Sequence, residues 1–502
     1  MGKNEVKYGA ILSYIFIIIN SVYGLFVTPY ILGTIGSTEY GVYKTIASLS
    51  SSLMVLDLGL GGTVMRYVAK YNALKESDKI NSFISMALVE CFILICVVFA
   101  VCTGVFKNLG NIYRNGLNES EVMLAQNLFM LLSVNMIMHI FENLLNGVLT
   151  GFNRFTVANS LKLIRIIFRI ILLFVILPIY KSSLVIVSID VVLTFIMIAI
   201  EYMYAILRLH VRVSPNFKNW DMTVFKESFV YTLLLFLTSI ASQINSNLDN
   251  VVIGAMKGAA AVTVYSMGLL IFGMFENLSC SISSVMLPTV TNVLCEDDGY
   301  RKVQKLIIKC GRIQFLFMIA AFSGFAVLGK DFINIWLGNG YDDVHIIALI
   351  LMGPAMLELC VNVCLSILRA ENRLKFRTFI LFGTTALNAI ITVVGCKYGS
   401  YIWAAIGTSA SFLIGSIVIM NIYYHKVFGF NMLKIYLKIF DGIWICALIS
   451  TIAIIISSSF MSKGLITFII NVVIYVAAYA VTLLMFGLKK DEKAYILKKH
   501  IS

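Results

Sequence analysis

The basic residues of this chain collect in every second gap between its apolar stretches. Fourteen apolar stretches follow one another along the 502 residues, and 31 of the 39 Lys and Arg lie in one alternating set of gaps, which includes both ends of the chain. The other eight are Lys44, Lys107, Arg114, Lys181, Lys257, Lys330, Lys397 and Lys463. Cationic loops resist translocation across a bilayer, so the alternation predicts a polytopic membrane protein with cytoplasmic N- and C-termini.

The composition agrees with a chain made mostly of membrane spans. Hydrophobic residues make up 60% of the sequence and charged residues 13%, about half of the charged share of a soluble domain. The net charge of +13 would suggest nucleic acid in a soluble protein, but here the cations flank spans and suit the lipid bilayer and its anionic headgroups. The ten cysteines show no zinc-ligand spacing. We therefore expect no nucleic-acid partner, no metal and no cofactor.

A bilayer span needs about 20 apolar residues, and fourteen segments of that kind predict an all-α fold with 14 transmembrane helices. The first six lie at roughly 9–33, 42–68, 80–106, 122–149, 158–180 and 183–207. The next six lie at roughly 226–256, 260–294, 306–329, 344–369, 375–397 and 401–424, and two more at roughly 435–459 and 463–487.

Residue pairs recur at nearly constant spacing in the two halves of the chain. The pattern Gly-x5-Val-Tyr occurs at Gly36–Tyr43 and again 222 residues later at Gly258–Tyr265. Two further pairs are 219 residues apart: Asn153–Arg154 with Asn372–Arg373, and Asp57 with Glu276. Six spans separate the members of each pair, so the repeats insert with the same orientation. Parallel repeats around a substrate cavity are a known transporter plan.

The duplication predicts three parts of the chain. Residues 1–212 form an N-terminal lobe of six helices, and residues 213–430 form a cytoplasmic linker and a second, pseudo-symmetric lobe of six helices. Residues 431–502 supply helices 13 and 14 and a cytoplasmic tail. A proline and an interfacial Trp within Val213–Asp221 suit a linker on the membrane surface.

Three motifs resemble the Wzx-type polysaccharide flippases, which belong to the multidrug/oligosaccharidyl-lipid/polysaccharide exporter superfamily. They are Ile31–Tyr43, Asp57–Gly61 and Gly151–Phe155. The resemblance implies a non-enzymatic flippase of the bacterial inner membrane that moves an undecaprenyl-pyrophosphate-linked oligosaccharide to the outer leaflet by alternating access. It further implies assembly of a cell-surface polysaccharide such as O-antigen or capsule, polysaccharide assembly proteins as partners, and a monomer. Unlike the lipid II flippase of this superfamily, the first span contains no arginine.

Two arginines of the fifth span suit the anionic head of such a substrate. Arg165 and Arg169 are four residues apart and therefore share a helix face. If the span begins near Asn159, Arg169 lies about 15 Å deep, at 1.5 Å per residue. The alternative is that both side chains snorkel to the cytoplasmic surface.

The seventh span carries five polar residues in an otherwise apolar segment. Gln243, Asn247 and Asn250 form one helical stripe, and Asn245 and Asp249 form a nearly opposite one. Asn20 of the first span corresponds in the repeat, so the first and seventh spans are expected to line the cavity. The alternative is hydrogen bonding between helices.

Acidic residues within spans are expected to have partners, because an ionised carboxylate in hydrocarbon is costly. Asp57 and Glu276, matched by the repeat, are candidates for proton or cation coupling, with paired structural carboxylates as the alternative. Asp249 is placed in the same group. Glu201, near the end of the sixth span, is expected at the cytoplasmic surface.

Three other functions compete with a flippase, and one of them is a non-transporting membrane scaffold, which the repeat and the deep charges disfavour. A cation-coupled multidrug or small-molecule exporter of the same superfamily would need a smaller, more aromatic and more acidic cavity. A membrane enzyme of polysaccharide assembly, such as a polymerase or glycosyltransferase, would need a substantial external loop with catalytic residues. The best candidate loop, Lys330–Asp343, is short.

Overall fold

The computed structural model of the protein describes residues 2–57, 59–211, 243, 247–283, 286–294, 296–371, 373–459 and 464–489. Every regular element in these ranges is a helix, so the predicted all-α class is confirmed. Contacts divide the chain into two compact units, Met1–Thr263 and Val264–Ser502. The division into 1–212, 213–430 and 431–502 stays a prediction, because the predicted linker and most of the seventh span lie outside the described residues.

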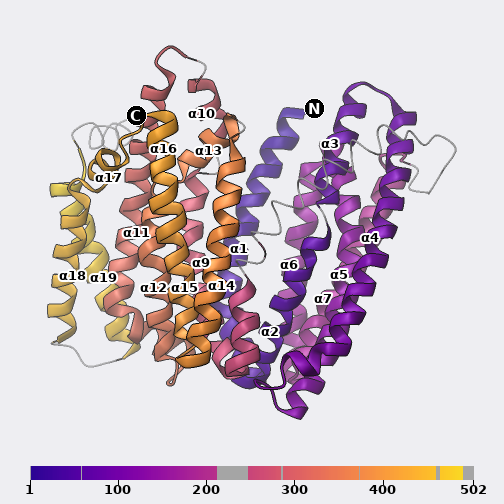
Figure 1. Ribbon diagram of the computed structural model, residues 1–502, viewed down its shortest axis with the longest axis horizontal. Coiled ribbons are helices and arrows are strands. Elements are labelled where there is room, and N and C mark those ends of the chain that lie inside the picture. The colour runs from indigo at the N-terminus through magenta and orange to yellow at the C-terminus, as the bar shows by residue number, and fades with distance from the viewer. Residues whose placement is uncertain are drawn as a thin grey trace. The chain divides into compact units, whose positions relative to one another are not determined.

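The first unit is built around one long central helix. Its helices are α1 (Gly2–Ile35), α2 (Ser37–Leu53), the 3-10 helix η1 (Met54–Asp57), α3 (Leu60–Ala73), α4 (Ser77–Ile112), α5 (Glu119–Gly151), α6 (Phe155–Tyr180) and α7 (Ser183–Leu207). Helix α5 packs against α2, α3, α4 and α7, and α6 packs against α1 and α7 (Figure 1).

Glycines allow α3 and α5 to approach closely. A Cβ atom on Gly147 would lie 2.5 Å from the Gly61 carbonyl oxygen, and one on Gly151 would lie 2.7 Å from the Val68 side chain. Gly147 and Gly151 have the small-xxx-small spacing that brings helices together in membranes, where no hydrophobic effect drives helix against helix. This close contact fixes the position of the polar residue Asn143, which lies one turn before Gly147 on α5.

The second unit continues the helical pattern with more interruptions. Its helices are α9 (Ala259–Ser283, which begins in the first unit), α10 (Met286–Leu294), α11 (Gly299–Leu337), α12 (Asp342–Leu359), α13 (Val363–Ala370), α14 (Leu374–Tyr398), α15 (Ile402–Ser411), the π-helix η3 (Phe412–Ile419), α16 (Met420–Phe428), α17 (Met432–Phe440), α18 (Ile443–Ser459), α19 (Leu465–Thr482) and the π-helix η4 (Leu483–Gly487).

Ten spans of the described chain are long and apolar enough to cross a membrane. Two bent pairs, α12 with α13 (50°) and α17 with α18 (44°), raise the number to twelve. Helix α1 contributes the shorter apolar segment Ile19–Ile35, and most of the predicted seventh span lies outside the described residues. The polytopic membrane character is confirmed, and the count of fourteen stays a prediction.

The second predicted span is also not a continuous helix. The second span was expected to run through roughly residues 42–68, but the helix tightens in η1 and restarts at Leu60 after Gly59, whose φ is 70°. A left-handed residue cannot continue a right-handed helix, and glycine adopts that conformation without steric cost. The interruption leaves Asp57 at the end of η1.

The turns before α6 and α14 have matching geometry, as expected of a repeat. Arg154 and Arg373 are the residues that precede the two helices. Each backbone N–H bonds a carbonyl five residues earlier, on Leu149 at 3.0 Å and on Leu368 at 2.8 Å.

One buried arginine joins α11 to the last helices of the second unit. Arg312 of α11 is 4% exposed. Its guanidinium donates to the carbonyl oxygens of Lys438 and Asp441, where α17 gives way to α18, and of Gly487 at the end of η4, each at 2.9 Å. In Figure 1, α18 and α19 lie side by side next to α11. The side chain supplies donors to carbonyls that a broken or ending helix leaves unpaired.

Candidate substrate cavity

A polar cavity of about 320 Å³ lies inside the first unit. Its walls come from α1, α5, α6 and α7, with the side chains of Phe16, Asn20, Asn135, His139, Lys162, Arg165, Ile166, Arg169 and Asp190. The volume falls in the range of small-molecule sites, about 300–1,000 Å³. The structure therefore brings three candidates predicted from sequence, Asn20, Arg165 and Arg169, into one cavity.

Arg169 makes a two-point ion pair across the cavity wall. Its Nε donates to Asp190 Oδ1 at 2.6 Å, and its Nη2 donates to Asp190 Oδ2 at 2.9 Å. The guanidinium also lies over the ring of Tyr23 on α1, 5.1 Å from the ring centre. The side chains of Arg169 and Asp190 are 22% and 19% exposed, so both reach the cavity and neither faces it fully.

Arg165, one turn earlier, is held by more acceptors. Its Nη1 donates to both carboxylate oxygens of Glu142, at 3.0 and 3.2 Å, while its Nη2 lies 3.2 Å from His139 Nε2 and donates to Thr194 Oγ1 at 2.8 Å. His139 Nδ1 lies 2.7 Å from Glu142. These contacts fit a neutral imidazole that donates from Nδ1 and accepts at Nε2. Arg165 thus links α5, α6 and α7.

The charges in and around the cavity do not cancel. Lys162, Arg165 and Arg169 are spaced along one face of α6, and Lys162 is exposed. Two carboxylates, Glu142 and Asp190, face them. Of the residues that line the cavity, three are cations and one, Asp190, is an acid, so the cavity favours an anionic ligand.

The polar residues of the predicted seventh span lie elsewhere in the first unit. The Asn247 amide donates to the Gln243 carbonyl oxygen at 3.1 Å and to its Oε1 at 3.3 Å, so these two side chains share a face as predicted. Asn250 is buried and donates to Ser48 Oγ of α2 at 3.0 Å. Asp249 is 3% exposed, and Asn245 lies outside the described residues. The structure does not bring Gln243, Asn247 or Asn250 into the cavity that holds Arg169.

The two carboxylates matched by the repeat differ in environment. Asp57 Oδ2 accepts a 3.0 Å hydrogen bond from the Asn143 amide of α5, and its Oδ1 is buried without a partner. Glu276 is exposed on α9. In the part of the chain that the structure describes, no cluster of three or more His, Cys, Asp or Glu has the geometry of a metal site.

The expectation that Glu201 lies at the cytoplasmic surface is wrong. The residue is 2% exposed, its Oε1 accepts a 3.4 Å hydrogen bond from Asn146 of α5, and its Oε2 has no partner. Position along the helix placed it near an end, but the face that carries it packs against α5. Asp190, Thr194 and Glu201 lie on one helical stripe of α7, and that spacing was the signal that sequence reasoning missed.

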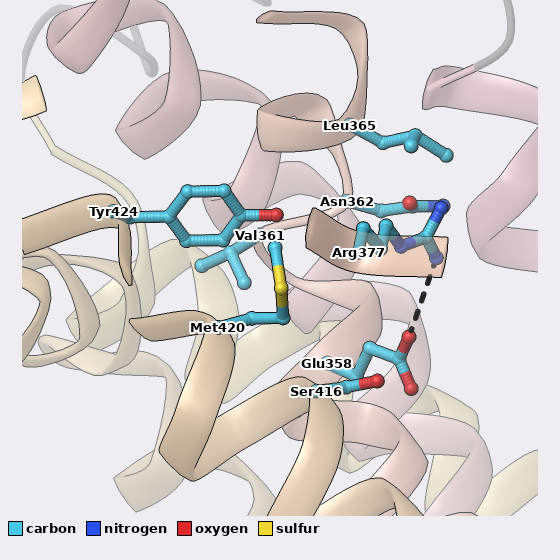
Figure 2. A pocket seen from close by; sticks show the side chains of 8 residues that line it. All are labelled: Glu358, Val361, Asn362, Leu365, Arg377, Ser416, Met420 and Tyr424. Carbon is cyan, nitrogen blue, oxygen red and sulfur yellow. Dashed lines mark ion pairs between the residues drawn. The ribbon is translucent and has the colours of Figure 1, made fainter. Parts of the chain in front are cut away.

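A second, much smaller polar cavity lies in the second unit, and Figure 2 shows its lining. Its volume of about 20 Å³ suits a water molecule rather than a substrate. The Arg377 guanidinium of α14 lies 3.9 Å from the Glu358 carboxylate of α12. Ser416 and Tyr424 also point into this space, beside the bend between α12 and α13.

Comparisons with known proteins agree with this architecture. Residues 6–294 match the family model described as polysaccharide biosynthesis protein. A Salmonella typhi protein assigned as an O-antigen transporter is 20% identical over 323 residues, which cover 62% of this chain and 71% of that protein.

Solved structures show the same fold. The lipid II flippase MurJ, in an inward closed conformation, is similar with a TM-score of 0.74 and 16% identity, over 94% of this chain and 98% of MurJ. An inward-facing multidrug resistance MATE family transporter of the MOP superfamily gives a TM-score of 0.55 and 15% identity, over 83% and 98% of the two chains. At these identities the likeness concerns the fold alone.

Proposed function

Because the chain belongs to the polysaccharide biosynthesis protein family, we propose that it is a flippase for an undecaprenyl-pyrophosphate-linked oligosaccharide. It moves this lipid from the cytoplasmic to the outer leaflet of the bacterial inner membrane by alternating access, and it thereby serves the assembly of a cell-surface polysaccharide. Both termini lie in the cytoplasm. The reaction is transport, and no covalent bond of the substrate changes.

The observation that carries this proposal is the guanidinium of Arg169 in a polar cavity within a membrane-spanning unit. A lipid-linked sugar can leave its tail in the bilayer, but its diphosphate and sugars must be hidden from about 30 Å of hydrocarbon. A fixed cation with a planar donor fork binds phosphate oxygens at two points and keeps its charge in an apolar setting.

The two arginines have different tasks in this proposal. Arg165 gives its two terminal nitrogens to Glu142, His139 and Thr194, and it therefore holds three helices together around the cavity. Arg169 engages one carboxylate, Asp190. Arg169 is the residue that binds the diphosphate, with the exposed Lys162 and the amide of Asn20 as further contacts along the same cavity.

The excess of cations separates this function from export of cationic drugs. A cationic drug would meet Lys162, Arg165 and Arg169 in the cavity, and like charges in a low-dielectric site repel strongly. The same residues attract a diphosphate. The coupling roles suggested for Asp57, Asp249 and Glu276 remain part of the proposal, as does the use of Gln243, Asn247 and Asn250 by the sugar.

The test is export of surface polysaccharide by cells whose chromosomal copy is replaced with a variant. Arg169→Ala should abolish export at near-normal membrane abundance, and Arg169→Lys should restore only part of it, because a point charge replaces the fork. Arg114→Ala, an exposed arginine outside the cavity, is the matched control and should export normally. Full export by Arg169→Ala at normal abundance contradicts the proposal.

A further inference from the structure

The carboxylate of Asp190 occupies the place on Arg169 that a phosphate would take. The two N–H groups that meet Asp190, from Nε and Nη2, form one edge of the guanidinium fork, at 2.6 and 2.9 Å. Carboxylates and phosphates bind this edge in the same bidentate way. A diphosphate that uses this edge must therefore displace Asp190.

The neighbouring ion pair provides the contrast. Arg165 and Glu142 are locked by additional partners, since Arg165 also meets His139 and Thr194 while His139 contacts Glu142. Asp190 lines the cavity, whereas Glu142 is not among its lining residues. Of the two acids, Asp190 is the one placed to exchange with a ligand that enters the cavity.

We propose that Asp190 is a resident counterion, which neutralises Arg169 while the cavity is empty and yields it to the substrate diphosphate. This inference rests on the proposed function and extends it from Arg169, which binds the diphosphate, to Asp190, which sets the affinity for the diphosphate. Asp190 is a specificity-determining residue in this scheme. The anion must outcompete a bidentate carboxylate, so a ligand with a single weak acceptor gains nothing from entering.

The exchange between Asp190 and the diphosphate keeps the charge of Arg169 balanced throughout the transport cycle. An unpaired arginine inside a membrane protein is costly, and the empty carrier must change conformation without its substrate. The pair with Asp190 keeps this site neutral on that return step. In the ion pair the Asp190 side chain is already 19% exposed at the cavity wall, so water can replace its lost hydrogen bonds after displacement. On the outer side the same carboxylate competes for Arg169 and speeds release of the substrate.

Because Asp190 competes with the anion, its substitution should affect anion binding in the opposite direction to the substitution of an acid that only supports the fold. Asp190→Asn removes the competing charge and leaves Arg169 available, so anion binding should become tighter. The dissociation constant should fall roughly tenfold or more, because the anion no longer competes with a charged hydrogen-bond acceptor. Export should slow, because release becomes difficult. If Asp190 only supported the fold, its loss would weaken binding or lower the amount of protein.

Binding of inorganic pyrophosphate to the purified full-length protein in lipid nanodiscs is the experiment. Asp190→Asn should bind pyrophosphate roughly tenfold more tightly than the wild type, and Asp190→Glu, which retains a carboxylate, should return toward wild-type affinity. Asp78→Asn, which removes an exposed carboxylate of α4 outside the cavity, is the control for the loss of one negative charge and should not tighten binding. Unchanged or weaker binding by folded Asp190→Asn, or binding by neither it nor the wild type, overturns the inference.

A spectroscopic measurement on the wild type covers the case in which Asp190→Asn does not fold. Pyrophosphate should shift the infrared carboxylate bands of Asp190, which are identified as those altered in Asp190→Glu. Absence of a shift when pyrophosphate is bound overturns the inference. The proposed function is tested separately by Arg169→Ala. If that variant loses binding while Asp190→Asn gains none, only the counterion role fails, whereas unchanged binding by Arg169→Ala removes the support for the flippase site itself.

Discussion

Gly36 and Gly258, 222 residues apart, adopt the same positive φ, 83° and 88°, and a helix begins directly after each of them. The first helix is α2 at Ser37, and the second is α9 at Ala259. Positive φ is a region that side chains disfavour and glycine accepts freely. Two halves that turn the chain in the same way at equivalent positions support the predicted duplication at the level of backbone conformation.

The two glycines should differ in their tolerance of alanine. Gly36→Ala meets no atom within 4 Å and should cost only the conformational strain, on the order of 1 kcal/mol. Gly258→Ala adds a Cβ atom 2.8 Å from the Gly116 carbonyl oxygen and should cost more. The thermal unfolding midpoint in detergent should therefore decrease less for Gly36→Ala than for Gly258→Ala. Gly104→Ala, helical and without neighbours within 4 Å, is the control, and a drop as large as that of Gly258→Ala would contradict the explanation.

Loss of the Arg165–Glu142 pair should reduce the amount of folded protein. Both side chains are largely buried, at 21% and 14% exposed, and removal of one partner leaves an uncompensated charge. For a pair of this kind the cost is roughly 3 kcal/mol. Glu142→Gln and Arg165→Ala should therefore lower membrane abundance and the unfolding midpoint. The loss should exceed that of Arg169→Ala, because Arg165 joins three helices whereas Arg169 bonds one carboxylate. Normal abundance of both variants together with lost export would assign Arg165 to the substrate instead.

Sequence reasoning found the cations of the cavity but not their partners. Helical spacing alone places Arg165 and Arg169 on one face, and the cost of burying charge indicates that such residues need partners. Helical spacing does not tell which acid belongs to which arginine, because Glu142 and Asp190 lie on other helices and meet the arginines only through packing. The surface exposure predicted for Glu201 is wrong for the same reason, because packing of α7 against α5 buries this residue.

Topology is the part of the fold that the sequence predicts most directly, because the distribution of Lys and Arg acts on insertion itself. A cysteine introduced near Lys218, in a variant cleared of its native cysteines, should resist an impermeant thiol reagent in intact cells and react after the membrane is opened. A cysteine beside Arg114, in an external gap of the predicted topology, should react in intact cells. Labelling near Lys218 from outside would contradict the cytoplasmic linker.

The basic-residue pattern uses Arg312 only to predict topology, but the structure gives this residue a role in holding the last helices. Its guanidinium serves carbonyl oxygens of Lys438, Asp441 and Gly487, and buried acceptors without donors cost about 1–3 kcal/mol each. Arg312→Met should thus lower the unfolding midpoint and speed backbone hydrogen exchange in α17–α19, while Arg312→Lys recovers part of both. Arg301→Met, exposed on the same helix, should change neither. Wild-type stability and exchange in Arg312→Met would show that packing alone holds these helices in place.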